Sequence, residues 1–376
     1  MLLLSGPNMG GNELKYITEC IETGWVSSVG SYVDQFEKMT AEFAGAKYAV
    51  ATSSGTTALH ICLLMLGVNK NDLVIAPNVT FVATINTITY TGASPVLIDA
   101  DENTWQMDLN LLEEFLETET EIRENFCYHK KSGKRIPVIL PAHILGNMCD
   151  MERLLNLAHK FHLTILEDST EALGSFYNGK HAGTFGKLGT FSYNGNKIIT
   201  TGGGGMIVTD DEKLAKEAKH LTTQAKADPM EYYHDEIGYN YRLVNVSAAM
   251  GVAQMEQLPV FMKRKKEIIA FYKSALNGVG DITFQKVDEK VNPNWWLPTI
   301  KTEKQKEILH LLNANKMQSR PFWIPMNQLP MFRKEIYFNH NDRSDHIYQR
   351  CLSIPCSTNI RDSELEAVAT EIKKVF

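Results

Sequence analysis

One lysine of this chain stands in a short polar turn directly ahead of a run of glycines. The turn reads Ser-Tyr-Asn-Gly-Asn-Lys over residues 192–197, and glycines occupy residues 202–205. A lysine that forms a Schiff base needs a fixed backbone, a partly desolvated amine and room for a planar cofactor, and a surface lysine needs none of these. From this segment alone, a solvated loop lysine and a reactive Lys197 are equally good interpretations.

An acidic side chain closes an apolar, strand-like run at residues 163–168. Such a run predicts a buried strand that delivers Asp168 at its carboxyl end, where open α/β sheets bind their ligands. A carboxylate there can keep a pyridine nitrogen protonated and make the ring an electron sink, as proteins do in pyridoxal phosphate (PLP) chemistry. The alternative is that Asp168 caps a helix that follows the strand.

A third segment, residues 51–60, places small hydroxyl residues and a glycine where a predicted strand becomes an apolar helix. Free backbone N–H groups and the helix N-terminus make such a corner a binding site for a phosphate. Gly55 and Thr56 lie in this corner, and Ser192 can add another hydroxyl. Ordinary helix capping explains each signal separately, but their combination with Lys197 and Asp168 favours a PLP site.

The glycine run itself predicts a backbone geometry and not a nucleotide loop. A Walker motif needs Gly-Lys-Ser/Thr after a defined gap, and a dinucleotide fingerprint needs spaced glycines between a strand and a helix. Here the glycines precede the predicted strand at residues 206–209. We therefore expect them to let the backbone pass close to Lys197.

The order of these and further motifs resembles that of the DegT/StrS nucleotide-sugar aminotransferases, which are PLP enzymes of fold type I. The resemblance covers nearly the whole chain. The matching segments are Thr23–Gly30, Ser54–Leu59, Asn78–Thr84, Gly92–Asp99, the Glu167–Asp168 pair, Ser192 with Lys197, Gly204–Gly205 and Gly238–Leu243. The first segment and the lysine turn are most similar to the branch that aminates C4 of keto-deoxy sugars on UDP or GDP, such as the perosamine, legionaminic and bacillosamine enzymes.

The resemblance implies PLP as the cofactor. It implies that Lys197 holds PLP through a Schiff base and then moves a proton, while Asp168 pairs with the pyridine nitrogen. The other implied cofactor-binding residues are Gly55, Thr56 and Ser192 at the phosphate, Phe81 against the ring face, and Asn240, which reaches the phosphate in the neighbouring subunit of a homodimer. Phe81 lies in an apolar run, so a place in the core is its alternative.

A second group of residues is implied in substrate binding. The resemblance places Trp25, Val26, Ser27 and Ser28 in the sugar-nucleotide pocket and His143 near the cofactor. Arg320 is a candidate contact for the donor carboxylate or a diphosphate. Each has a structural alternative: Trp25 as a loop anchor, His143 as a structural histidine, and Arg320 as an exposed loop arginine.

Glu171 departs from the family pattern, in which a glutamine is expected three residues after the aspartate. A second acid near Asp168 raises the cost of ionising both. We keep Glu171 among the cofactor-binding residues, and expect that it either points away from the site or shares a proton.

The rhythm of strand-like and helical runs predicts an α/β fold. The strand-like runs are residues 48–51, 73–76, 96–99, 137–140, 164–166 and 206–209, and a long helical pattern covers 247–276. Together with the family resemblance, this predicts a large PLP-binding domain at 1–255, with an N-terminal arm at 1–30 and a mostly parallel seven-stranded sheet, and a smaller C-terminal α/β domain at 256–376. The charge-rich segment 113–134 is expected to be an exposed helix and loop.

Composition points to a soluble enzyme. The 376 residues carry a formal net charge of -6 and no concentrated basic run, which argues against nucleic-acid binding. No apolar run approaches the roughly 18 residues of a membrane span, and the first residues lack the features of a signal peptide, so we expect a cytoplasmic protein with no membrane contact. The six cysteines are scattered, without zinc-type spacing, and we predict no metal.

These observations predict an aminotransferase that moves an amino group from L-glutamate to C4 of a nucleotide-linked 4-keto-6-deoxy sugar in surface-polysaccharide biosynthesis. The expected substrate is UDP-linked and N-acetylated, and the expected assembly is a homodimer with shared active sites. One alternative is a PLP-dependent sugar dehydratase of the same fold, although relatives of that type carry histidine in place of Lys197. The other is a non-catalytic protein that binds a sugar nucleotide.

Overall fold

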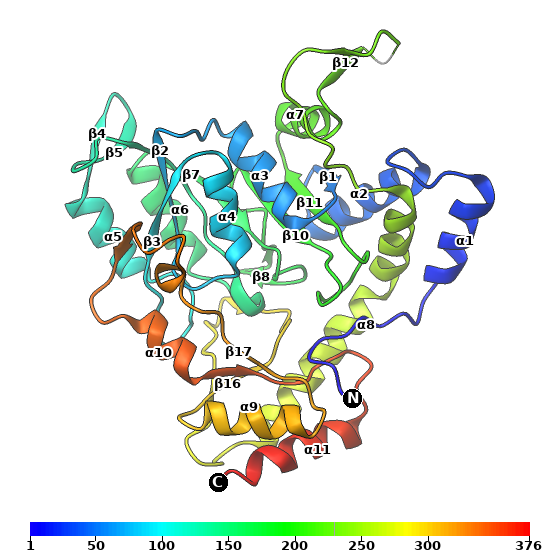
Figure 1. Cartoon of the computed structure of the whole chain (residues 1–376), viewed down its shortest axis with the longest axis vertical. Coiled ribbons are helices and arrows are strands. Elements are labelled where there is room, and N and C mark those ends of the chain that lie inside the picture. Colours follow the sequence, from blue (N-terminus) through cyan, green and yellow to red (C-terminus); the bar gives the residue numbers. More distant parts are fainter. Residues whose placement is uncertain (229) are drawn as a thin grey trace.

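A ten-stranded sheet forms the centre of the larger part of the molecule (Figure 1). The computed structural model describes residues 1–228 and 230–376. Eight strands follow one another across the sheet in this order: β1 (Tyr48–Thr52), β11 (Gly205–Thr209), β10 (Leu188–Ser192), β7 (Thr164–Asp168), β6 (Arg135–Ile139), β2 (Asp72–Pro77), β3 (Ser94–Ile98) and β18 (Ile336–Phe338). All neighbouring pairs are parallel except those that β11 makes with β1 and β10. The predicted α/β fold with a mostly parallel sheet is confirmed. The sheet has ten strands and not the predicted seven, because β18 adds to it from beyond residue 255 and a hairpin at residues 120–129 joins it.

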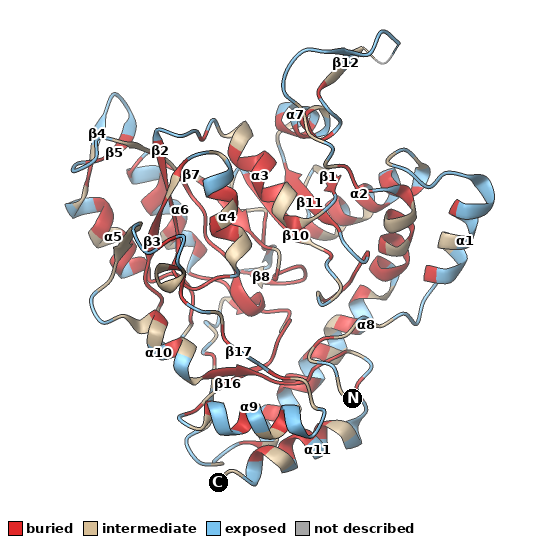
Figure 2. Ribbon diagram, viewed as in Figure 1, coloured by how far each residue is buried: buried red, intermediate tan, exposed pale blue. Residues whose placement is uncertain are grey.

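Helices cover both faces of this sheet, and each face has its own apolar core. On one face, α5 (Leu109–Thr118) and α6 (Met151–Lys160) pack against buried side chains of β2, β3, β6 and β7. On the other, α3 (Gly55–Met65), α4 (Val82–Tyr90) and α7 (Glu212–Thr222) enclose a second cluster. Burial therefore concentrates on the strands and on the helix faces turned towards them (Figure 2), which explains why the strands read as continuous apolar runs.

The predicted exposed helix and loop at 113–134 is wrong for its second half. Helix α5 ends at Thr118, and the chain then forms an antiparallel hairpin of β4 (Thr120–Arg123) and β5 (Phe126–His129). The hairpin joins the large sheet through Tyr128, which pairs with Arg135 of β6. Along β5, Cys127 and His129 are buried while Phe126 is exposed and Tyr128 is partly buried, as in a strand with one solvated face.

A 31-residue helix, α8 (Asn245–Ala275), leads from the large sheet to the C-terminal part of the chain. The N-terminal helices α1 (Glu13–Thr23) and α2 (Ser31–Ala44) pack along it. The C-terminal part forms a four-stranded antiparallel sheet of β14 (Thr283–Phe284), β16 (Thr299–Lys301), β19 (Cys351–Ser353) and β17 (Arg320–Pro321), with α9 (Gln305–Ala314), α10 (Arg343–Arg350) and α11 (Asp362–Lys373).

Two short strands from the C-terminal part pair with strands that precede residue 255. Strand β18 lies beside β3 at the edge of the large sheet. Strand β15 (Val291–Asn292) pairs with β8 (Phe176–Tyr177), which in turn pairs with β9 (Lys180–His181). A separate two-stranded ribbon contains β12 (Lys226–Asp228) and β13 (Tyr233–His234). Across the described residues, no helix combines the length and apolarity needed to cross a membrane.

Candidate active site

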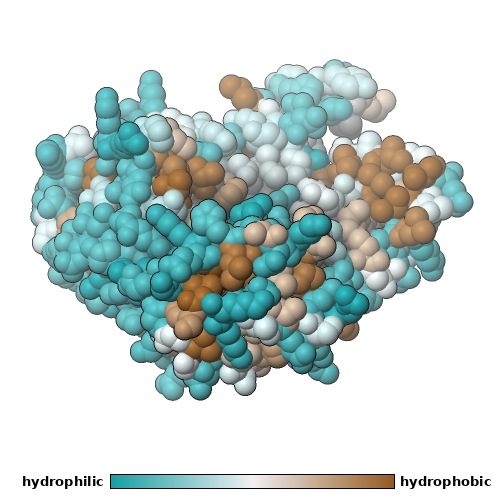
Figure 3. Space-filling view, turned by 60° about the horizontal axis from the view of Figure 1, so that its bottom comes forward, coloured by the Kyte–Doolittle hydropathy of each residue, from teal (hydrophilic) through white to brown (hydrophobic). Residues whose placement is uncertain are grey.

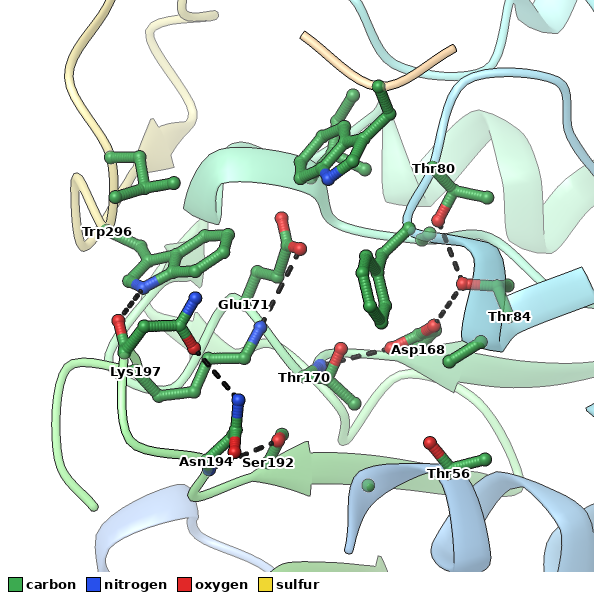
Figure 4. Close-up of a pocket in the computed structure, with 18 of the residues that line it drawn as sticks. Thr56, Thr80, Thr84, Asp168, Thr170, Glu171, Ser192, Asn194, Lys197 and Trp296 are labelled. Carbon is green, nitrogen blue, oxygen red and sulfur yellow. Dashed lines mark hydrogen bonds and ion pairs between the residues drawn. The ribbon is translucent and has the colours of Figure 1, made fainter. Parts of the chain in front are cut away.

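A cavity of about 340 Å³ lies where β7 and β10 end, beside the first turn of α3. The chain beyond residue 255 contributes part of its wall, through residues 296–297, 320–323 and 353. Most of the residues singled out in the sequence line this cavity, namely Gly55, Thr56, Phe81, His143, Asp168, Glu171, Ser192, Lys197 and Arg320. Figure 4 shows several of them with their side chains turned towards one another.

Asp168 is the last residue of β7, and its carboxylate is held by two donors (Figure 4). The hydroxyl of Thr84, in the first turn of α4, donates to Oδ2 at 2.7 Å, and the backbone N–H of Thr170 donates to Oδ1 at 3.2 Å. Thr80 supports Thr84 through a 2.8 Å hydrogen bond between their hydroxyls. These two donors hold the buried carboxylate of Asp168 at the cavity wall. The carboxylate can still accept a hydrogen bond from an N–H group of a ligand. Thr84 and Thr170 were not assigned roles from the sequence, although Thr84 ends one of the motifs quoted.

The first turn of α3 forms the predicted anion corner. Ser54 caps the helix by accepting a hydrogen bond from the N–H of Thr57 at 3.1 Å, while the N–H groups of Gly55 and Thr56 precede the first intrahelical bonds. A Cβ atom at Gly55 would lie 2.9 Å from the side chains of both Ser192 and Thr170, so only glycine fits between them. The corner therefore presents backbone N–H groups and hydroxyls to an anion.

The glycine run packs against both this corner and the start of the lysine turn, since the N–H of Tyr193 donates to the carbonyl of Gly204 at 2.8 Å. A Cβ atom at Gly205 would lie 2.3 Å from the carbonyl oxygen of Ser54. Gly205 also pairs with Ser192, the first residue of the lysine turn, so the backbone of the glycine run passes close to that turn as expected. The glycines do precede a strand, as predicted, because β11 begins at Gly205.

Lys197 and Glu171 face each other inside the cavity (Figure 4). The Lys197 amine lies 3.7 Å from Oε1 of Glu171, and the other carboxyl oxygen accepts a hydrogen bond from the N–H of Leu145 at 2.8 Å. Burial raises the pKa of Glu171 to about 7, although Lys197 and the Leu145 N–H act in the opposite direction. Burial also lowers the pKa of Lys197, against the attraction of Glu171 and Asp168. Of the two possibilities left open for Glu171, the side chain does not point away, and the pair can share a proton.

The indole ring of Trp296 lies against the same amine. The Lys197 nitrogen is 3.9 Å from the ring centroid, and the indole N–H donates to the carbonyl of Asn196 at 2.7 Å. Sequence reasoning missed this residue because it lies about 100 positions after the lysine, in a segment with no recognised motif. Trp295 directly precedes it, and the sequence does not indicate which of the two rings faces the cavity.

His143 is held by a second buried acid, Glu167. His143 Nε2 lies 2.9 Å from Glu167 Oε2, and the backbone N–H groups of residues 183, 185 and 186 also donate to this carboxylate. Because Glu167 is an acceptor, Nε2 carries the proton that is donated, and Nδ1 is left facing the interior. Nδ1 is buried and has no hydrogen-bond partner among the described residues.

Two of the predicted residues on the wall remain exposed. Phe81 precedes α4 with 52% of its surface exposed, so its ring belongs to the cavity wall and not to the core. Arg320 lies in β17, also exposed, and donates to the carbonyl of Ser319. Within residues 1–228 and 230–376 no carboxylate forms an ion pair with Arg320, so its guanidinium is available to an anion.

The remaining predicted residues do not line the cavity of their own chain. Trp25 is 57% exposed, and Asn245 holds the backbone of its segment by donating to the carbonyl of Trp25 at 2.7 Å and to that of Ser27 at 2.6 Å. Asn240 is also exposed, in an isolated bridge with Thr223. The predicted roles of these residues stay predictions.

The groups in the cavity fit PLP. The helix N-terminus with Ser192 matches a phosphate, the carboxylate of Asp168 matches a pyridine N–H, and Lys197 supplies an amine of lowered pKa that can bond to an aldehyde.

Comparison with known proteins agrees with this chemistry. The family model described as the DegT/DnrJ/EryC1/StrS aminotransferase family matches residues 7–373. A GDP-perosamine synthase of Escherichia coli O157:H7 is 36% identical over 373 residues, which cover 98% of this chain and 97% of that protein. A GDP-perosamine synthase of Vibrio cholerae is 34% identical over 381 residues, covering 100% and 99%.

Solved structures show the same fold. Helicobacter pylori PseC, an aminotransferase involved in the biosynthesis of pseudoaminic acid, matches with a TM-score of 0.88 and 25% identity, covering 100% of this chain and 99% of that one. DesV of S. venezuelae matches with a TM-score of 0.87 and 26% identity, covering 97% and 94%. The fold type and the family expected from the sequence are both confirmed. The chain belongs to the DegT/DnrJ/EryC1/StrS aminotransferase family and is a PLP-dependent sugar aminotransferase.

Proposed function

We propose that the protein transfers an amino group from L-glutamate to C4 of a 4-keto-6-deoxy sugar carried on a nucleoside diphosphate, for a surface polysaccharide. The observation that carries this proposal is the meeting of Lys197, Asp168 and the N-terminus of α3 in one cavity. GDP is the first carrier to test, because the relatives that are 33–36% identical include three proteins named GDP-perosamine synthase. The UDP-linked, N-acetylated sugar expected from the sequence has no such support.

PLP, when bound, supplies the electron sink for the reaction. Lys197 would bond to the cofactor and, once released, would carry a proton between the amine-bearing carbon and the cofactor. Asp168 would hold the ring nitrogen in its protonated form, and Thr84 keeps the carboxylate of Asp168 aimed into the cavity through its 2.7 Å hydrogen bond. Glu171, with its raised pKa, would keep a proton within reach of the Lys197 amine.

Substrate anions would meet the outer wall of the cavity. Arg320 provides a guanidinium that no described carboxylate pairs with, which suits the carboxylate of the amino donor or a diphosphate. The exposed ring of Phe81 would cover one face of the cofactor. Phe81 precedes α8 in the sequence and Arg320 follows it, so both parts of the chain contribute to this wall.

A second copy of the chain would complete the site. Trp25, Val26 and Val29 are exposed, and in Figure 3 an apolar patch lies at the upper right, on the side of the molecule that carries α1. Exposed apolar surface of this kind is typical of an interface. In a homodimer, residues 25–28 and Asn240 would serve the cavity of the neighbouring subunit, which explains why they lie outside the cavity of their own.

The proposal is tested by turnover of a panel of GDP-, UDP- and dTDP-linked 4-keto-6-deoxy sugars with L-glutamate, followed by identification of the product. We expect a 4-amino sugar, with the highest kcat/KM for the GDP substrate. Absence of turnover across the panel would overturn the substrate class. Borohydride reduction of the loaded enzyme, followed by peptide mapping, is expected to fix the cofactor to Lys197, and a label on another lysine would overturn its assignment.

A further inference from the structure

All three polar atoms of the buried residue Trp296, two in its backbone and one in its indole, form hydrogen bonds. Its backbone N–H donates to Oδ1 of Asn294 at 2.8 Å, its carbonyl accepts from the buried amine of Lys265 at 2.9 Å, and its indole N–H donates to the carbonyl of Asn196 at 2.7 Å. A tryptophan held only by packing needs none of these three bonds. The ring therefore keeps one orientation, with a face turned to the Lys197 amine (Figure 4).

The same framework ties the ring to the acid on the other side of the amine. Asn294 donates from its side-chain nitrogen to the carbonyls of Glu171 and Leu173, both at 2.9 Å. Asn294 thus links the backbones of Trp296 and Glu171, which are 125 positions apart in the chain. Between them lies the Lys197 nitrogen, 3.9 Å from the ring centroid and 3.7 Å from the carboxyl oxygen.

We propose that Trp296 is an active-site residue that, with Glu171, forms a seat for the Lys197 amine whenever that amine carries no covalent bond. The electron-rich face of an indole attracts a cation, most strongly where water is excluded. The seat stabilises the protonated form of the released amine, which would otherwise be an unpaired charge in a buried site. It also keeps the amine close to the reacting atoms. This inference rests on the proposed role of Lys197 and adds a residue to it.

Burial and two nearby carboxylates determine the pKa of the Lys197 amine. Glu171 and Asp168 both favour its protonated form, while burial favours the neutral form. The indole face adds to the first effect without adding a charge, so its loss is expected to lower the pKa of Lys197. Removing the ring of Trp296 by substitution with leucine is expected to lower that pKa by about one unit, a tenfold change in the acid constant.

The experiment uses the full chain loaded with pyridoxamine phosphate, a form in which Lys197 has no covalent bond to the cofactor. Competitive acetylation across a pH series, read by mass spectrometry of the Lys197 peptide, gives the pKa of this amine. Trp296→Phe keeps a ring face but loses the bond to Asn196, and is expected to shift the pKa by less than half as much as Trp296→Leu. Because phenylalanine preserves most of the packing, this variant keeps the test usable if the leucine variant does not fold.

The adjacent tryptophan provides a matched control. Trp295 faces away from the cavity and lies over a different lysine, with the Lys273 nitrogen 4.5 Å from its ring centroid. Trp295→Leu is expected to leave the pKa of Lys197 unchanged and to lower that of Lys273, while Trp296→Leu does the reverse.

An unchanged or raised pKa of Lys197 in Trp296→Leu overturns the inference, and so does an equal shift in Trp296→Leu and Trp296→Phe or a comparable shift of Lys197 in Trp295→Leu. Borohydride mapping on the wild-type enzyme separates this outcome from failure of the proposed function. If borohydride labels Lys197 but the pKa of Lys197 does not shift in Trp296→Leu, only the role of Trp296 is refuted. If the label is on another lysine, the role proposed for Lys197 is refuted as well.

Discussion

Replacing Glu171 by glutamine is expected to stabilise the cofactor-free protein, and more so as the pH rises. Burial raises the pKa of this carboxyl from its ordinary 4.5 to about 7, so the fold favours the protonated acid. Glutamine has nearly the same shape as that acid and still offers an oxygen to the N–H of Leu145. The substitution therefore removes the cost of ionising a buried group while keeping its hydrogen bond.

The sign and the size follow from the difference between the folded and unfolded pKa. A raised folded pKa gives stability that is fully present below about pH 4.5 and is lost as the pH rises through about 7. At 1.36 kcal/mol per unit, the advantage of the glutamine variant grows from about 1 kcal/mol at pH 5 to about 3 kcal/mol at pH 8. For a chain of 376 residues, with an unfolding entropy of about 0.8 kcal/mol/K, this growth is about 3 °C in Tm.

Thermal unfolding of wild type and Glu171→Gln at pH 5 and pH 8 measures this difference. Glu289→Gln is the control, because Glu289 is exposed and its substitution is expected to give the same small Tm change at both values of pH. A Tm difference between Glu171→Gln and wild type that does not grow with pH would refute the reasoning, because it would mean that Glu171 ionises as easily inside the protein as in water.

Two further predictions concern the dimer and the phosphate corner. Mixing Lys197→Ala with Asn240→Ala chains under exchange conditions is expected to restore about a quarter of wild-type activity, because half of a random set of dimers would contain one intact site of two; no recovery would place Asn240 in the site of its own chain. Gly205→Ala, whose Cβ would lie 2.3 Å from the carbonyl oxygen of Ser54, is expected to weaken PLP binding about tenfold in an absorbance titration. Gly203→Ala is the matched control, with its nearest atom at 3.9 Å, and equal PLP affinity in the two variants would contradict the packing argument.

The strands of the large sheet could be predicted from the sequence where they are buried on both faces. Six of its strands were predicted from apolar runs, and each is present. Strand β10 was missed because Leu-Gly-Thr-Phe-Ser contains a glycine and two hydroxyl residues, and its strand character comes from pairing with β7 and β11. The β4–β5 hairpin was missed for a similar reason, since the charges of segment 113–134 mask its alternation. The domain limits at 255 and 256 remain a prediction.

The residues of the candidate site could be predicted where neighbouring residues in the sequence share one chemical role. Lys197, Asp168 and the corner at Gly55 each stand in a short segment whose residue types reveal their chemistry, and the cavity contains all three. The direction of the Glu171 side chain could not be predicted, because it depends on the N–H of Leu145 and on the distant Lys197 turn. Trp296 could not be predicted either, because its role arises from three hydrogen bonds to residues that no local pattern connects.

Strands β15 and β18 have a consequence for protein engineering. Each belongs to the C-terminal part of the chain and pairs with a strand that precedes residue 255. A fragment ending at residue 255 would leave β3, whose last four residues are apolar, as an unprotected sheet edge that invites self-association. The two parts are therefore not exchangeable modules, and a chimera that takes its substrate wall from a relative must also inherit residues 291–292 and 336–338, or replace them with matching strands.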